Sequence, residues 1–226
     1  ITDGDFESVA VIPSPTGAED QVWTSVKRTI DGSDVRYVEQ FQPRDWGTDP
    51  NDAWFVDSAL TYSGTATDSF SGLDHLEGET VSIYADRLIE NPETVVSGAI
   101  TIDNAASRVL AGLPFTSKLE SFPLFVDPQE RAYNKKVKRT YFDLLETGAM
   151  KYGGTSSATL TDVNFENSLI KDPSATAQDL YTSTVAQKDF IWRYGSLKKQ
   201  TIFVQSEQPV PLTIRAITVD YDLIKN

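Results

Sequence analysis

Apolar and polar residues alternate with a period of two along much of the chain, which is the pattern of half-buried β-strands. The clearest example is a pair of runs at 22–28 and 35–41, separated by Asp31-Gly32. An Asp-Gly dipeptide between two such runs predicts a β-hairpin with a type I′ turn, because that turn needs positive φ at both central residues. The pattern therefore predicts a hairpin over residues 22–41.

Further strands are predicted at short intervals after the hairpin. An irregular stretch at 43–52 precedes strand character over 54–62, and a tight turn at 73–76 lies between Ser71-Gly72 and Glu77-Gly78. The other predicted strands are 80–85, 94–96, 99–102, 109–113, 138–146, 190–194, 199–205 and 212–221. Within 138–146, the residues Thr140, Phe142 and Leu144 are expected on one face of the strand.

Helical signals are scarce. Residues 172–186 favour one short helix capped by Ser174, and 149–162 favours a loop or a polar hairpin. We therefore expect an all-β fold, mainly antiparallel, built of small sandwich or barrel modules with at most one or two short helices. Two modules are expected, residues 1–125 with the N-terminal hairpin and residues 126–226, which can pack back on the first.

The composition is that of a globular protein, with 39% hydrophobic and 23% charged residues among 226. No apolar run approaches the roughly 20 residues that a membrane span needs. The chain opens with Ile1 in an acidic segment, so we expect a fragment or a processed product and no signal peptide. The lack of cysteine excludes disulfides, thiolate metal sites and cysteine nucleophiles, and a reducing cytoplasm is the default compartment.

The net charge of −13 disfavours nucleic-acid phosphates and anionic membranes as main partners. Residues 127–151 differ, because they carry six basic and four acidic residues. The basic cluster within them is either a solvated face or a docking patch for an acidic neighbour such as another copy of the chain. A second candidate for subunit docking is Trp46 in a polar loop, whereas Trp23 and Trp54 lie in strand patterns and are expected in the core. The four residues of the basic cluster are Lys135, Lys136, Lys138 and Arg139.

We find no catalytic, cofactor-binding or metal-binding motif. His75 is the one histidine and lies in a predicted turn without a Gly-x-Ser-x-Gly elbow, so a packing role or a turn hydrogen bond is favoured. The acidic segments at 3–5 and 49–52 favour turns, with an opportunistic calcium site as the alternative. A glycosidase acting through two carboxylates stays open, because sequence does not show their separation.

Several segments resemble the tail nozzle family of short-tailed bacteriophages, also called tail tubular protein B or stabilisation protein. The hairpin VWTSVKRTIDGSDVRYVEQF at 22–41 resembles that family's first hairpin, and the stretch from Phe70 to Ile102 contains its Gly-Leu-x-His-Leu-Glu-Gly run at 72–78. Weaker similarities lie at 110–115, 136–154 and 208–222. Where many members have Asp-Gly after the Ala of their V-x-V-x-A-D pattern, this chain has Asp86-Arg87.

The resemblance implies a structural virion protein, not an enzyme, located in the tail and assembled in the host cytoplasm. Members form a ring, usually a hexamer, that contacts other tail or portal-adaptor proteins while genomic DNA passes without specific binding. The resemblance also gives His75, Glu77 and Gly78 a fold-defining role in a turn. The alternative function is a carbohydrate-binding or host-recognition β-module that uses Trp46 and other loop aromatics as its platform.

Overall fold

The computed structural model describes residues 4–14, 17, 19–43, 45–53, 55–154, 160–163 and 200–224, together with the backbone of 181–187. These residues are mostly antiparallel β-sheet, which confirms the all-β prediction. Their helices are three short 3₁₀ turns, and none is long and apolar enough to cross a membrane. These turns are η1 (Pro50–Asp52), η2 (Asp74–Leu76) and η3 (Pro128–Ala132). Trp54 and the predicted strand 190–194 lie outside the described residues.

The chain forms two compact units, with the main division between Thr116 and Ser117. Sequence analysis places its boundary at 125/126. The segment between the two positions contains β9 (Ser117–Glu120), which pairs with β14 (Phe203–Ser206) in unit 2.

Unit 1 begins with a three-stranded antiparallel sheet in the order β1-β2-β3. Its strands are β1 (Asp5–Ile12), β2 (Gln21–Ile30) and β3 (Ser33–Gln40). Asp31 and Gly32 form the turn between β2 and β3, with φ of 45° and 71°, and Ile30 pairs with Ser33 across it. The predicted hairpin is confirmed, including the positive φ at both central residues.

The second sheet of unit 1 has the order β4-β8-β5-β6, with β7 pairing to β5. Its strands are β4 (Asp57–Ser71), β5 (Thr80–Ala85), β6 (Leu88–Ile89), β7 (Glu93–Thr94) and β8 (Ala99–Leu113). Strand β8 unites the predicted strands 99–102 and 109–113, since Asp103 and Asn104 are exposed strand residues here and do not form a turn.

One end of the hairpin packs on the second sheet. Ile30, with Val35 and Tyr37 packed beside it, joins a cluster that the second sheet and η2 complete. The buried members from those elements and the residues directly beside them are Phe70, Leu73, Leu76, Val81, Ile83, Ala85, Val95, Ile100, Ile102, Ala106, Val109 and Ala111.

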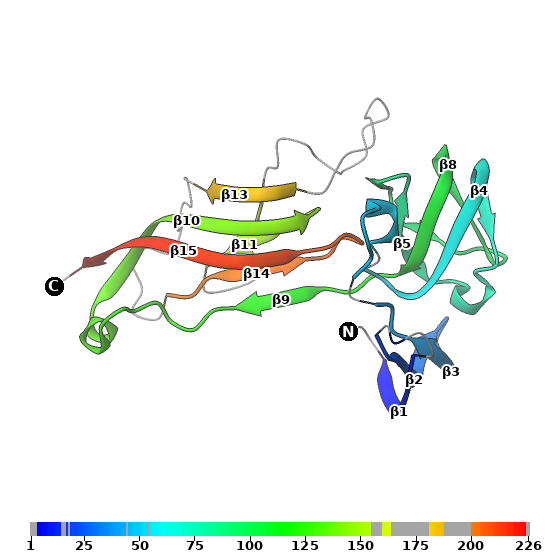
Figure 1. Ribbon diagram of the computed structural model, residues 1–226, viewed down its shortest axis with the longest axis horizontal. Coiled ribbons are helices and arrows are strands. Elements are labelled where there is room, and N and C mark those ends of the chain that lie inside the picture. The colour runs from blue at the N-terminus through cyan, green and yellow to red at the C-terminus, as the bar shows by residue number, and fades with distance from the viewer. Residues whose placement is uncertain are drawn as a thin grey trace. The chain divides into compact units, whose positions relative to one another are not determined.

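Unit 2 consists of two sheets that share a core. In the first, β10 (Asn134–Thr147) lies between β13 (Tyr181–Gln187) and β15 (Thr213–Ile224) (Figure 1). The second has the order β12-β11-β14-β9, with β11 (Lys151–Gly153) and β12 (Thr161–Asp162). Thr140, Phe142 and Leu144 have no exposed surface, which confirms their predicted common face. The buried core residues are Phe142, Leu144, Met150, Tyr152, Val163, Ile202 and Val204.

The predicted helix at 172–186 is wrong over residues 181–186, which lie in β13. This segment includes the β-branched residues Thr182, Thr184 and Val185, and it pairs along one edge of β10. Ladder hydrogen bonds with β10 outweigh the weak helical preference of the segment. Residues 172–180, which include Ser174, lie outside the described residues.

Candidate functional site

Strand β10 carries all four residues of the predicted basic patch, but Lys135 lies inside unit 2. Its side chain has no exposed surface, and its Nζ donates to the backbone carbonyls of Glu130 at 2.8 Å and Tyr133 at 3.2 Å. These bonds connect β10 to the end of η3 and satisfy a charge that would otherwise be costly to bury. Lys135 is therefore not part of an exposed docking surface.

The other three basic residues also have different surroundings. Lys136 is exposed, whereas Lys138 forms an exposed ion pair with Asp222 on the neighbouring strand β15, at 2.7 Å. Arg139 is half-buried, and its Nη1 donates to the hydroxyl of Tyr141 at 2.8 Å. The sequence cluster does not form one patch of four free charges, and its predicted docking role stays a prediction for the exposed members.

Trp46 lies half-buried in the loop before η1. Its ring meets Phe55 edge to face, with centroids 5.8 Å apart. The sugar-platform role of Trp46 stays a prediction. Trp23 was expected in the core, but it is half-buried on the face of β2 opposite the buried residues Thr24 and Val26.

A buried arginine connects the hairpin to the second sheet of unit 1. The side chain of Arg28 is 2% exposed, and it binds both carboxylate oxygens of Glu39 at 2.8 Å. A second carboxylate, that of Asp57 at the start of β4, lies 3.3 Å from Nη2. Ser58 Oγ donates to Glu39 Oε1 at 2.5 Å. We call these four residues the Arg28 cluster.

The charges of the Arg28 cluster stabilise one another. Burial alone would raise the pKa of Glu39, but hydrogen bonds from Arg28 and Ser58 and the charge of Arg28 outweigh it, so the pKa is lowered. Burial alone would likewise lower the pKa of Arg28, yet its bonds to Glu39 and its attraction to Asp57 leave the pKa raised. Both residues are therefore held in their charged forms.

His75 and Ser58 lie together but do not form a catalytic relay. His75 Nε2 lies 2.9 Å from the backbone oxygen of Ser58, whereas the Ser58 hydroxyl donates away from the imidazole to Glu39. A relay would need the imidazole to accept from the hydroxyl. The backbone oxygen of His75 accepts from the Tyr37 hydroxyl, and the two rings meet edge to face at 5.9 Å. This geometry is the turn hydrogen bond and packing role expected for His75.

The Gly-Leu-x-His-Leu-Glu-Gly run forms a turn around η2. The carboxylate of Glu77 accepts from the backbone nitrogens of Ser97 at 2.9 Å and Gly98 at 2.7 Å, which join the turn to the start of β8. Gly78 has φ of 80°, and a Cβ there would lie 3.3 Å from Asp31 Oδ1 of the hairpin turn. Leu73 and Leu76 of the same run are buried in the core. Both the polar and the apolar residues of the run therefore make contacts that hold the turn in the fold.

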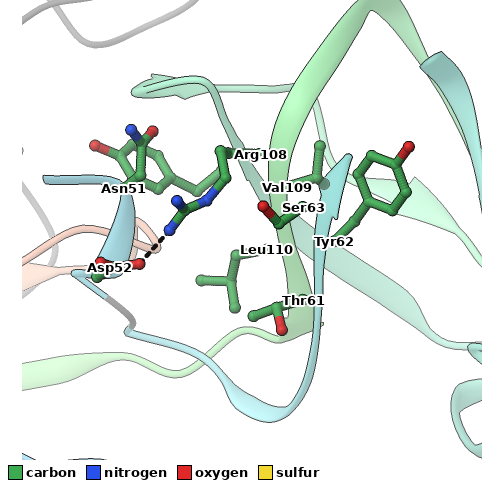
Figure 2. Close-up of a pocket in the computed structure, with 9 residues that line it drawn as sticks. Asn51, Asp52, Thr61, Tyr62, Ser63, Arg108, Val109 and Leu110 are labelled. Carbon is green, nitrogen blue, oxygen red and sulfur yellow. Dashed lines mark hydrogen bonds and ion pairs between the residues drawn. The ribbon is translucent and has the colours of Figure 1, made fainter. Parts of the chain in front are cut away.

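A small pocket lies between η1 and the strands β4, β5 and β8. Its volume is about 90 Å³, room for several water molecules, and Arg108 reaches across its mouth to Asp52 (Figure 2). Asp49 Oδ2 lies 4.0 Å from the same guanidinium. The arginine charge is therefore already compensated, which disfavours an anion in the pocket. The pocket is lined by Asn51, Asp52, Thr61, Tyr62, Ser63, Tyr84, Arg108, Val109 and Leu110.

The acidic segment 49–52 forms a turn, and its carboxylates already have partners within the chain. Asp49 Oδ1 accepts from the backbone nitrogen of Asn51 at 3.0 Å and from its side-chain amide at 2.9 Å. Asp49 and Asp52 both face Arg108. Among the described residues, no group of three or more histidine and acidic side chains is placed to share a metal ion. Turn formation, the favoured reading of 49–52, is the geometry observed, and Asp3 of the other segment lies outside the described residues.

Sequence reasoning missed the Arg28 cluster, although a signal was present. Arg28 occupies the same face of β2 as the buried residues Val26 and Ile30, since all three are even-numbered positions of one strand. A charged residue in an apolar face indicates a buried partner of opposite charge. Glu39 could have been suspected, but Asp57 could not, because only the packing of the two sheets brings it near.

No model of a known protein family matches the chain, and no similar sequence was found among curated proteins.

Proposed function

We propose that the chain is a structural subunit of a bacteriophage virion, a tail nozzle or connector protein that assembles with its own copies into a ring around the genome channel. One observation carries the proposal: the run at 72–78, the most specific part of the resemblance, serves the fold at almost every position. Leu73 and Leu76 fill the core, His75 bonds to β4, and Glu77 bonds to the turn before β8. A motif whose residues maintain the fold fits a family whose members have a structural role.

Charge supports the same proposal. The chain carries −13, and a channel wall of this sign lets DNA slide past because it offers phosphates few cations to bind. Three of the four cations of the basic cluster do not contradict this, since Lys135 is buried, Lys138 is paired with Asp222 and Arg139 is half-buried against Tyr141, whereas Lys136 is exposed.

The test uses the whole chain. Light scattering and negative-stain electron microscopy of the purified protein are expected to show rings, with six copies as the first expectation. Mass spectrometry of purified virions is expected to find the chain in the tail, together with portal-adaptor or other tail proteins. A strictly monomeric protein that is absent from virions would contradict the proposal, and binding on a glycan array that Trp46→Ala abolishes would favour the carbohydrate-binding alternative.

A further inference from the structure

The three-stranded sheet of unit 1 has two open edges. In the part of the chain that the structure describes, β1 pairs with β2 alone, and β3 pairs with β2 alone. Strands β1 and β3 run in the same direction, because each is antiparallel to β2. An open edge offers unpaired backbone N–H and C=O groups to another strand.

Apolar side chains surround both edges. On β1, Phe6, Val9, Val11 and Ile12 are 43%, 67%, 58% and 50% exposed. On the other side, Val38 of β3 is 75% exposed. Natural edge strands are usually protected by charges, prolines or bulges. Here a bulge at Glu7 interrupts the start of β1, but residues 8–12 beyond it carry no charge.

On each face of the sheet, both edge strands carry apolar side chains. Residues of β1 and β3 that pair with even-numbered residues of β2 share one face, which carries Phe6, Val9 and Val11 on β1 and Tyr37 on β3. The opposite face carries Ala10 and Ile12 on β1 and Val38 on β3. A β1 strand placed along the free edge of β3 would therefore cover Val38 with apolar side chains.

One exposed cation on the β3 edge also suits the acidic β1 edge. The charged residues of β1 are both acidic, Asp5 and Glu7. Strand β3 carries two acids, but Asp34 is already paired with Lys27 at 2.6 Å and Glu39 with Arg28 at 2.8 Å. Its one base, Arg36, is 62% exposed and binds Glu7 of its own molecule through Nε at 2.9 Å. A guanidinium has five N–H donors, so Arg36 can also donate to a second carboxylate. Asp5 in the β1 strand of another copy brings that carboxylate, because Glu7 is already bound to Arg36 of its own molecule, whereas an anionic membrane would meet the acids of β1.

We propose that β1 of one copy pairs in parallel with β3 of the next, so that the three-stranded sheet continues from copy to copy. The contact joins two different surfaces of the molecule, and such a head-to-tail contact closes into a ring when the rotation between copies allows it. The inference rests on the proposed ring assembly and names the strands that form it.

Introduced cysteines test the pairing directly, because the chain has none of its own. The double variant Ala10→Cys with Val38→Cys places one thiol on each edge, on the same face, and Ser8→Cys or Ile12→Cys replaces the first for other registers. Within one molecule β2 separates β1 from β3, so the two strands lie about 10 Å apart. That distance exceeds the roughly 7 Å limit for a disulfide. Only a contact between copies can link them.

On mild oxidation, at least one double variant is expected to give a ladder of covalent oligomers on a non-reducing gel, and each single variant is expected to stay monomeric. The absence of a ladder from every double variant, under conditions where the unmodified chain assembles, would overturn the pairing. So would a covalent dimer from a single variant, since it would place two identical edges together.

A charge on the edge provides a second measurement. Val9→Lys is expected to raise the concentration needed for assembly at least tenfold, because the ammonium is desolvated in the paired sheet. Val96→Lys is the matched control, since Val96 is 65% exposed in a turn of the same unit and is expected to assemble normally. Normal assembly of a folded Val9→Lys variant would contradict the inference.

The outcomes separate the inference from the proposed function. Rings that enter virions without a ladder would leave the function intact and overturn the pairing. A ladder from a protein that virions lack would support the pairing and overturn the function. A monomeric chain would overturn both.

Discussion

Arg28 connects the two sheets of unit 1 through a buried charge. It places one charge, 2% exposed, between two carboxylates that come from different elements. A buried ion pair is not by itself a large source of stability, because desolvation offsets the attraction. Removing one partner is costly, since the other charge then remains buried without compensation.

Arg28→Met is therefore expected to destabilise the fold by about 3 kcal/mol, the lower end for a broken buried pair because Glu39 keeps some contact with water. Chemical denaturation measures the change in the free energy of unfolding. Arg36→Met removes the exposed pair with Glu7 and is the control, with a much smaller expected loss because exposed ion pairs contribute little to stability. Equal losses in the two variants would show that burial of the Arg28 cluster carries no energetic weight.

The turn at Asp31-Gly32 makes a simpler prediction. Gly32 has φ of 71°, and no atom lies within 4 Å of a Cβ built there, so a substitution would meet backbone strain and no steric clash. Gly32→Val is expected to cost about 1–3 kcal/mol in thermal or chemical unfolding. Gly32→Asn is the matched control, because asparagine tolerates left-handed φ, and it is expected to cost much less.

Asp86-Arg87 is the corresponding case with a non-glycine residue. Its φ values of 45° and 70° resemble those of Asp31-Gly32, and Arg87 occupies the position that glycine takes in the first turn. Arg87→Gly is expected to be more stable than the original chain by about 0.5–1 kcal/mol, because glycine relieves the left-handed backbone strain. The greater chain entropy of glycine in the unfolded state offsets part of this gain. A lower melting temperature would mean that contacts of the Arg87 side chain outweigh the strain.

At the scale of elements, local pattern predicted best where a strand has one buried face. In β10 the alternation of Thr140, Phe142 and Leu144 is visible in the sequence and is the buried face of the structure. The Asp-Gly turn was equally readable, because its chemistry is local. These features needed no knowledge of the remaining chain.

Long strands exposed on both sides were harder to predict. Strand β4 continues through Gly64 and Thr65 to Ser71, although that part is mostly small, polar and exposed. Its pairing with β8 holds it as a strand, and a partner distant in sequence leaves no periodic signal. The prediction of a basic patch of four residues failed for a similar reason. Lys135 and Lys136 are adjacent in the sequence, but the strand directs the first inward and the second outward.

The two lysines make the prediction at this scale. Lys135→Glu would direct a carboxylate at the backbone oxygens of Glu130 and Tyr133, and a buried uncompensated charge of this kind costs about 3–5 kcal/mol. Lys136→Glu, on the exposed face of the same strand, is expected to stay within about 0.5 kcal/mol of the original chain. Denaturant titration of both variants decides it, and similar stability of the two would contradict the burial of Lys135.

Across the whole molecule, many carboxylates are bound in ways that acid would undo. Hydrogen bonds from the backbone of Gly98 and Ser97 hold the pKa of Glu77 below its ordinary value of 4.5. The Lys27 ammonium likewise lowers the pKa of Asp34, and the backbone nitrogen of Val126 is the main cause of a lowered pKa at Glu130. A carboxylate with a lower pKa in the folded chain favours folding above its unfolded pKa, and this contribution is lost as the pH falls through the folded value.

Thermal stability is accordingly expected to fall as the pH drops below about 4.5, and Glu77→Gln should flatten part of that fall. At pH 7 the variant lacks the charged acceptor and melts lower than the original chain, and between pH 7 and pH 3 this difference should shrink, because Glu77 becomes protonated as the pH falls toward and through its lowered pKa. Glu93→Gln, elsewhere in unit 1, is the control. A difference between Glu77 and its variant that is the same at both pH values would contradict the assignment.

The strand order of unit 2 has a consequence for synthesis on the ribosome. Strand β10 finds its described partners only in β13 and β15, and the bond from Thr147 to Thr213 spans 66 residues. At 5–20 residues per second, the apolar face of β10 waits roughly 3–13 s for β15 to be made. The described strands of unit 1 pair without such a delay, since they all precede Thr116. The nascent chain thus carries the paired strands of unit 1 while the apolar face of β10 is still exposed to aggregation.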